Sequence, residues 1–63
     1  MNTSNFIKKL LLLSGKSQKE VSEITGKSES HISEWKRENG KKIMFDTAME
    51  LCQKLNINPK KLF

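Results

Sequence analysis

Hydroxyl, carboxylate and imidazole side chains gather in residues 28–37, in a pattern suited to hydrogen bonding. Ser28 can cap a helix, and Ile32 and Trp35, three positions apart, would share its buried face. The outward face of this helix then presents Glu29, Ser30, Ser33 and Glu34, with His31 beside them. Donors and acceptors displayed along a helix in this way can read base edges in the major groove of DNA.

Residue types that perform catalysis or hold metals are scarce. The chain has one His and one Cys, and it contains no CxxC, HExxH, P-loop or GxGxxG pattern. Ser28, Ser30 and His31 are close in sequence, but no spacing reveals an acid that would orient them. We therefore expect no catalytic residue, no metal, no cofactor and no small-molecule ligand.

Two short helices joined at Gly26 are expected to position the outward polar set. Ser17 and Glu20 fit an S-x-x-E capping box, so the first helix should begin at Ser17. Val21 and Ile24 would form its buried stripe. Gly26 can adopt the left-handed conformation that ends a helix without the clash of a side chain.

The flanking segments also predict helices. Thr3, Ser4 or Asn5 would cap an opening helix. Its core face would comprise Phe6, Ile7, Leu10, Leu11 and Leu13. After a basic loop, a core helix is expected from Met44 to Leu55, where apolar residues recur three and four apart.

The C-terminal residues complete the fold. Asn58 and Pro59 should cap and start a final helical turn that brings Leu62 and Phe63 against the core. Cys52 lies among apolar residues and is expected to be a reduced core thiol. No stretch alternates as a strand would. The expected fold is all-α, a five-helix bundle forming one domain over residues 1–63.

Charge and length restrict the partner. Twelve Lys and Arg against seven Asp and Glu give a net charge of +5 and a pI near 9.6. This excess of positive charge favours a polyanion such as nucleic acid as the partner; a solvated surface is the alternative.

The longest apolar run, residues 10–13, is far shorter than the ~20 residues of a spanning helix. No signal peptide is visible either, so we expect a cytoplasmic protein. So small a domain buries only about 60% of its unfolded surface, which favours association with a second copy.

The helix pair resembles the helix-turn-helix of the phage repressor and Cro family, also called the XRE family. Ser17 and Gln18 match the family's opening Ser-Gln, Ser22 matches the small residue where the helices approach, and Gly26 matches the turn. The run 32–37 resembles the end of the family's recognition helix and a string in the activator of lambdoid phages.

Three positions depart from the family pattern. Lys16 and Lys27 stand where apolar residues are usual, and Thr25 stands where Leu is common. Lysine stems can nevertheless cover apolar surface while their ammonium groups stay in water.

The resemblance implies a lambda-repressor-like bundle and two sets of DNA contacts. The implied phosphate contacts are Gln18, Lys27, Ser28, Lys36, Arg37, Lys41 and Lys42. The implied base contacts are Glu29, Ser30, His31, Ser33 and Glu34. Arg37 has an alternative role as an ion-pair partner of Glu34 or Glu38. Glu29 has an alternative role in offsetting the helix macrodipole.

The function implied is sequence-specific binding of double-stranded DNA by a transcription regulator. We expect a phage or plasmid repressor that occludes a promoter, bound as a homodimer to a palindromic operator. Phe45, Met49, Leu62 and Phe63 would form the apolar dimer contact. The alternatives are an activator, a recombination directionality factor, and, in a different class, an antitoxin-like or anti-repressor module that binds protein.

Overall fold

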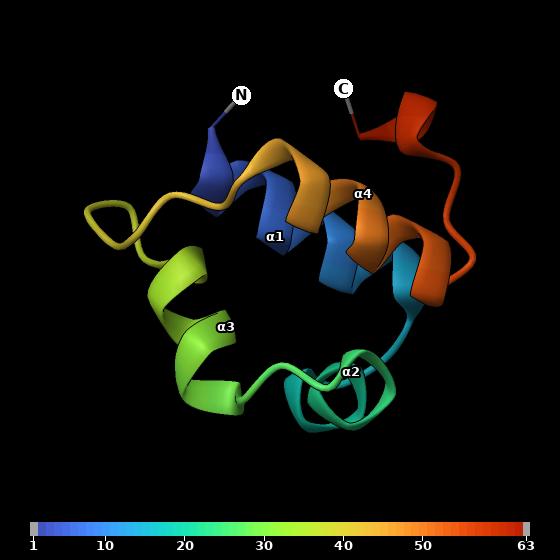
Figure 1. Ribbon diagram of the computed structural model, residues 1–63, viewed down its shortest axis with the longest axis horizontal. Helices are drawn as coiled ribbons and strands as arrows, with labels where there is room; N and C mark the ends of the chain where they lie inside the picture. The colour runs from blue at the N-terminus through green and yellow to red at the C-terminus, as the bar shows by residue number, and fades with distance from the viewer. Residues whose placement is uncertain (1, 63) are drawn as a thin grey trace.

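The computed structural model describes residues 2–62, which form four α-helices and one short 3₁₀ turn (Figure 1). The elements are α1 (Thr3–Ser14), α2 (Gln18–Thr25), α3 (Glu29–Lys36), α4 (Phe45–Lys54) and η1 (Pro59–Lys61). Helix α3 contacts both α1 and α2, and α2 also contacts α4. The all-α prediction is confirmed for residues 2–62. The count of five helices is not, because the last element is a single 3₁₀ turn.

The N-cap of α1 lies one residue before the first of the predicted caps. The Asn2 side chain is the N-cap and accepts a 3.0 Å hydrogen bond from the backbone N–H of Asn5. The predicted caps Thr3 and Ser4 are instead buried inside the first turn. Their hydroxyls bond to distant segments, because Thr3 Oγ1 accepts from the N–H of Ile43 at 3.1 Å and Ser4 Oγ donates to a carbonyl at the end of α3.

One apolar core joins all four helices. It consists of Phe6, Ile7, Leu10, Val21, Ile32, Trp35, Ile43, Ala48, Leu51, Cys52 and Leu55, with Leu11, Ile57 and Leu62 packed against it. Leu13, which the sequence assigned to this core, is exposed. Cys52 lies in this core, as predicted, and burial raises the pKa of its thiol.

The buried stripe of α2 differs from the prediction. Ile24 is 43% exposed, whereas Thr25 is only 2% exposed. Thr25 tolerates burial because its Oγ1 donates a 2.7 Å hydrogen bond to the carbonyl oxygen of Val21, one turn earlier. The stripe is therefore Val21 and Thr25, and the prediction for Ile24 is wrong.

Helix α4 and η1 follow the predicted boundaries closely. Met44 is the N-cap of α4 rather than its first residue, and it is 71% exposed. Phe45, at the start of the helix, is 62% exposed. Asn58 caps η1 by accepting from the N–H of Lys60, and Pro59 is the first residue, as expected. The predicted contact of Phe63 lies outside the described residues.

Candidate nucleic-acid interface

The start of α2 is fixed by the predicted capping box. The N–H of Ser17 donates to Oε1 of Glu20 at 3.0 Å, and the N–H of Glu20 donates to Oγ of Ser17 at 3.1 Å. The bond from the Ser17 N–H, together with the Ser17 hydroxyl, stabilises the carboxylate and holds the pKa of Glu20 below its usual value. The N–H groups of Gln18 and Lys19 have no acceptor inside the helix. Such groups favour an anion at this end of α2.

The turn between α2 and α3 is held by backbone geometry and by one serine. Gly26 has a φ of 77°, the left-handed conformation expected of it, and its N–H donates to Ser22 O at 2.9 Å. The Ser22 hydroxyl donates to the carbonyl oxygen of Lys27 at 2.5 Å. Ser28 then caps α3 by accepting from the N–H of His31. These contacts fix the orientation of α3 relative to α2.

Helix α3 is attached to the rest of the chain along one face and at both ends. Ile32 and Trp35 are buried, as predicted. At the first residue of α3, the carbonyl oxygen of Glu29 accepts from Nε2 of Gln18 at 3.1 Å. At the last residue, the carbonyl oxygen of Lys36 accepts from Oγ of Ser4 at 2.7 Å. The opposite face of α3 therefore faces solvent.

The five predicted base-contact residues differ in how they lie on α3. Glu29, Ser30, His31 and Ser33 are exposed, and Glu34 is partly exposed. The His31 ring lies against Trp35, with ring centroids 4.2 Å apart and planes tilted by 35°. Arg37 pairs with Glu34 at 3.1 Å, which is one of the two pairings that the sequence left open. Because both side chains of this pair are well exposed, water screens it and it contributes little to stability.

Gln18 makes a contact that the sequence analysis missed. Besides Glu29 O, its Nε2 also donates to Oγ of Ser33 at 2.5 Å. The side chain of a predicted phosphate ligand therefore touches a predicted base-reading residue. No sequence pattern signals this bond, because it joins residues 15 positions apart whose proximity depends on the angle between the helices.

The loop after α3 packs directly on the end of that helix. A Cβ on Gly40 would overlap the carbonyl oxygen of Glu34 and lie 2.9 Å from its carbonyl carbon. The N–H of Gly40 also donates to the carbonyl oxygen of Arg37 at 3.0 Å. Lys41 and Lys42, which follow at once, are exposed. Gly40 thus allows the basic part of the loop to stay close to α3.

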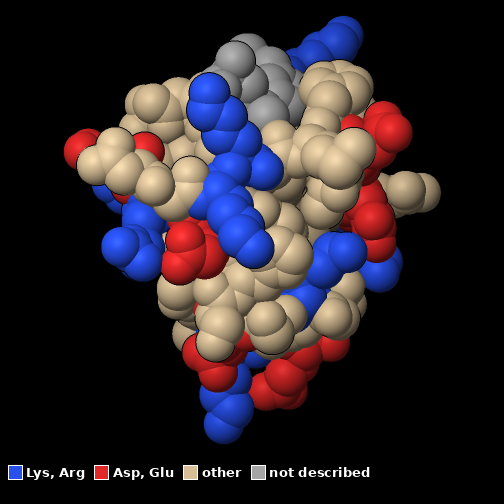
Figure 2. Space-filling model, turned by 60° about the vertical axis from the view of Figure 1, so that its left-hand side comes forward, with Lys and Arg blue, Asp and Glu red and all other residues tan. Residues whose placement is uncertain are grey.

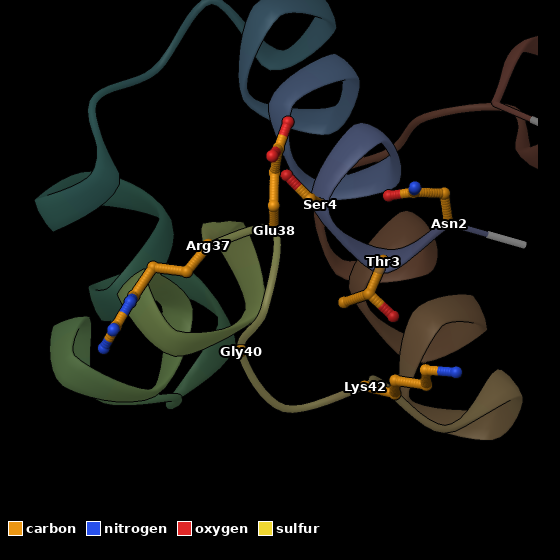
Figure 3. A pocket seen from close by; sticks show the side chains of 7 residues that line it. All are labelled: Asn2, Thr3, Ser4, Arg37, Glu38, Gly40 and Lys42. Carbon is orange, nitrogen blue, oxygen red and sulfur yellow. The ribbon is translucent and has the colours of Figure 1, made fainter.

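Basic side chains of this region face solvent in several directions. Figure 2 shows Lys and Arg side chains running down the middle of the face that carries α3 and its loop, with acidic side chains to either side and below. In the shallow hollow between the loop and the start of α1, Arg37 and Lys42 extend away from each other (Figure 3). Lys36 is exposed and Lys27 is half-buried. The hollow itself therefore does not gather cations.

The fold and this interface define a helix-turn-helix domain. A family model described as "Helix-turn-helix" matches residues 7–62, and the chain belongs to this family, in its Cro and phage repressor (XRE) branch. The family comprises DNA-binding transcription regulators. No curated protein and no solved structure matched the chain.

None of the helices within residues 2–62 has the length and apolar character required to cross a bilayer.

Proposed function

We propose that the protein is a phage or plasmid repressor that inserts α3 into the major groove and occludes a promoter in the cytoplasm. The observation that carries the proposal is the arrangement of α3. Its apolar side packs against the domain and both of its ends are hydrogen-bonded to it, while five of its polar side chains are exposed. A major groove about 12 Å wide admits one α-helix, and a fixed helix loses little conformational freedom on entering it.

The proposed DNA contacts fall into two groups. Glu29, Ser30, His31, Ser33 and Glu34 would face base edges. Gln18, Lys27, Ser28, Lys36, Arg37, Lys41 and Lys42 would contact phosphates. Nε2 of the Gln18 amide already donates to two acceptors within the domain, Glu29 O and Ser33 Oγ. We therefore assign its phosphate contact to the backbone N–H at the start of α2.

A homodimer on a palindromic operator fits the size and surface of the domain. Half-sites lie about 34 Å apart, and the longest extent of the domain is 27 Å, so two bound copies would be close neighbours. Phe45 is largely exposed and Met49 partly so, on the helix that follows the basic loop, while Leu62 is half-buried against the core. We propose Phe45 and Met49 as the main apolar dimer contact.

The test is selection of bound duplexes from a random pool, followed by titration of the selected duplex at several salt concentrations. We expect a two-fold symmetric site whose binding weakens steeply as salt rises. In transcription from a template carrying this site across a promoter, the protein should lower transcript yield. Equal binding of all duplexes, or a rise in transcript yield, would contradict the repressor proposal.

A further inference from the structure

We infer that the outer face of α1 is a docking surface for an acidic amphipathic helix of a partner protein. This surface, called the α1 patch below, comprises Lys8, Lys9, Leu12, Leu13 and Lys61, all of which are exposed. The inference goes beyond the proposed function and does not depend on it.

The positive charge of the chain is distributed unevenly. Residues 17–50, which include the helix-turn-helix and the loop after it, hold all seven acidic residues but only six of the twelve Lys and Arg, a net charge of −1. The other six basic residues lie in residues 1–16 and 51–63, which contain no acidic residue. The excess of +5 therefore comes from outside the segment that is proposed to face DNA.

Two of these lysines surround a leucine on the outer side of α1. Lys8 and Lys9 precede Leu12 by four and three positions, the spacing of neighbours on a helix surface. Helix α1 contains no acidic residue, and among residues 2–62 no ion pair involves Lys8 or Lys9. Leu10, on the opposite side of the helix, is 1% exposed and packs in the core. A partner on the outer side would therefore leave the core and α3 undisturbed.

The apolar part of the α1 patch is open to solvent. Leu12 is 79% exposed and Leu13 is 44% exposed. Leu13 also lines a hollow of about 270 Å³ with residues 56–58 and Lys61, where the end of α1 meets the segment after α4 (Figure 1). The hollow brings a third lysine beside the leucines and leaves room for a side chain from outside. Contiguous exposed apolar surface with a polar rim is typical of interaction sites.

Charge and shape together select the occupant. Phosphates of a duplex would match the lysines, but they would set charged oxygens against Leu12 and leave the hollow empty. An anionic lipid surface would take up Leu12 but has no side chain to fill the hollow. A helix with an apolar row flanked by carboxylates satisfies both requirements, because its acids pair with the lysines while its apolar side chains cover the leucines and enter the hollow.

The experiment measures binding of the full chain to a labelled helical peptide in which Leu recurs every third and fourth position, with Glu at the positions between. Fluorescence anisotropy should show saturable binding. Two control peptides replace every Glu by Gln or every Leu by Ser, and both should bind more weakly. If either control binds as well as the acidic peptide, carboxylates or apolar side chains are not recognised and the inference is overturned.

Variants at exposed residues locate the site. Leu12→Ser and Lys8→Glu should each weaken peptide binding about 5-fold, which corresponds to the ~1 kcal/mol of an important interface residue. Met44→Ser removes another exposed apolar side chain, and Lys19→Glu makes the same change in net charge on α2. Neither control should alter binding. Equal weakening by Lys8→Glu and Lys19→Glu would show attraction by net charge alone and would overturn the inference.

Two further measurements test the other occupants. Vesicles containing phosphatidylglycerol should bind Leu12→Ser as well as they bind the wild-type protein, and sedimentation should give the same mass for both proteins. Weaker binding of Leu12→Ser to vesicles, without peptide binding by the wild-type protein, would identify the α1 patch as a lipid-binding surface. A lower mass for Leu12→Ser would identify it as a contact between copies of the chain. Either result would replace the acidic partner.

Discussion

The hydroxyl of Ser4 donates a 2.7 Å hydrogen bond to the carbonyl oxygen of Lys36, so the first turn of α1 holds the last residue of α3. Ser4 is buried, and the two residues are 32 positions apart. This bond satisfies one of the carbonyl groups that a helix C-terminus leaves without an internal partner.

Removing this hydroxyl should destabilise the domain. Ser4→Ala leaves the Lys36 carbonyl without its partner, and we expect the free energy of unfolding to fall by about 1–2 kcal/mol. Urea denaturation followed by circular dichroism measures the change. Ser30→Ala, at an exposed serine of α3, is the matched control and should alter stability by less than about 0.5 kcal/mol. Equal stability of the two variants would mean that water replaces the Ser4 bond at no cost.

Adding a methyl group at Gly40 should force the loop away from α3. The Cβ of Gly40→Ala would overlap a backbone carbonyl, which cannot rotate aside as a side chain can. We expect a loss of about 1–3 kcal/mol in the free energy of unfolding, as for overpacking in a core. Asn39→Ala, at the exposed preceding residue, is the control. If Gly40→Ala and the wild-type protein are half unfolded at the same urea concentration, the loop moves freely enough to accept the methyl group.

Stability should depend on pH through Glu20. Its pKa in the folded protein lies below the ordinary 4.5 because Ser17 donates to the carboxylate. A lowered folded pKa means that the stabilisation is complete well above pH 4.5 and is lost as pH falls through the folded pKa. Glu20→Gln should therefore flatten the decline of melting temperature below about pH 4.5. Glu23→Gln, in the same helix but outside the capping box, should leave the Glu20 contribution intact.

Loop lysines and groove-facing residues should affect DNA binding differently. Lys41→Ala or Lys42→Ala should weaken binding to every duplex alike and reduce the slope of log K against log salt by about 0.9 for each phosphate that the variant no longer neutralises. Ser30→Ala or Glu34→Ala should instead change which duplex is preferred. Fluorescence anisotropy on selected and scrambled duplexes measures both effects. Uniform weakening by all four variants would remove the distinction between base and phosphate contacts.

Local signals in the sequence predicted the helix ends well. The capping box at Ser17, the left-handed turn at Gly26 and the cap at Ser28 each depend on bonds within four residues, so residue type and spacing suffice to identify them. The buried face of α3 and the burial of Cys52 in α4 were predicted for a similar reason, since apolar residues recur there at helical spacing. Met44 and Phe45, which fit the same spacing at the start of α4, are exposed.

Features that depend on packing between helices could not be predicted in this way. Ile24 and Thr25 are equally placed to follow Val21, three or four residues on, and only the direction of approach of the neighbouring helices decides which is buried. Thr3 and Ser4 have the residue types of caps, but their hydroxyls bond partners 40 and 32 positions away. The Gln18 contacts with α3 belong to the same class.

The ends of α3 are bonded through backbone carbonyls, at Glu29 from Gln18 and at Lys36 from Ser4. Every amino acid carries a carbonyl, so these attachments do not depend on which side chains occupy the solvent-facing positions. Side chains on that face can therefore be substituted while the position of α3 is kept. New target preferences can arise in this way, by engineering or by evolution, without a change in the rest of the domain.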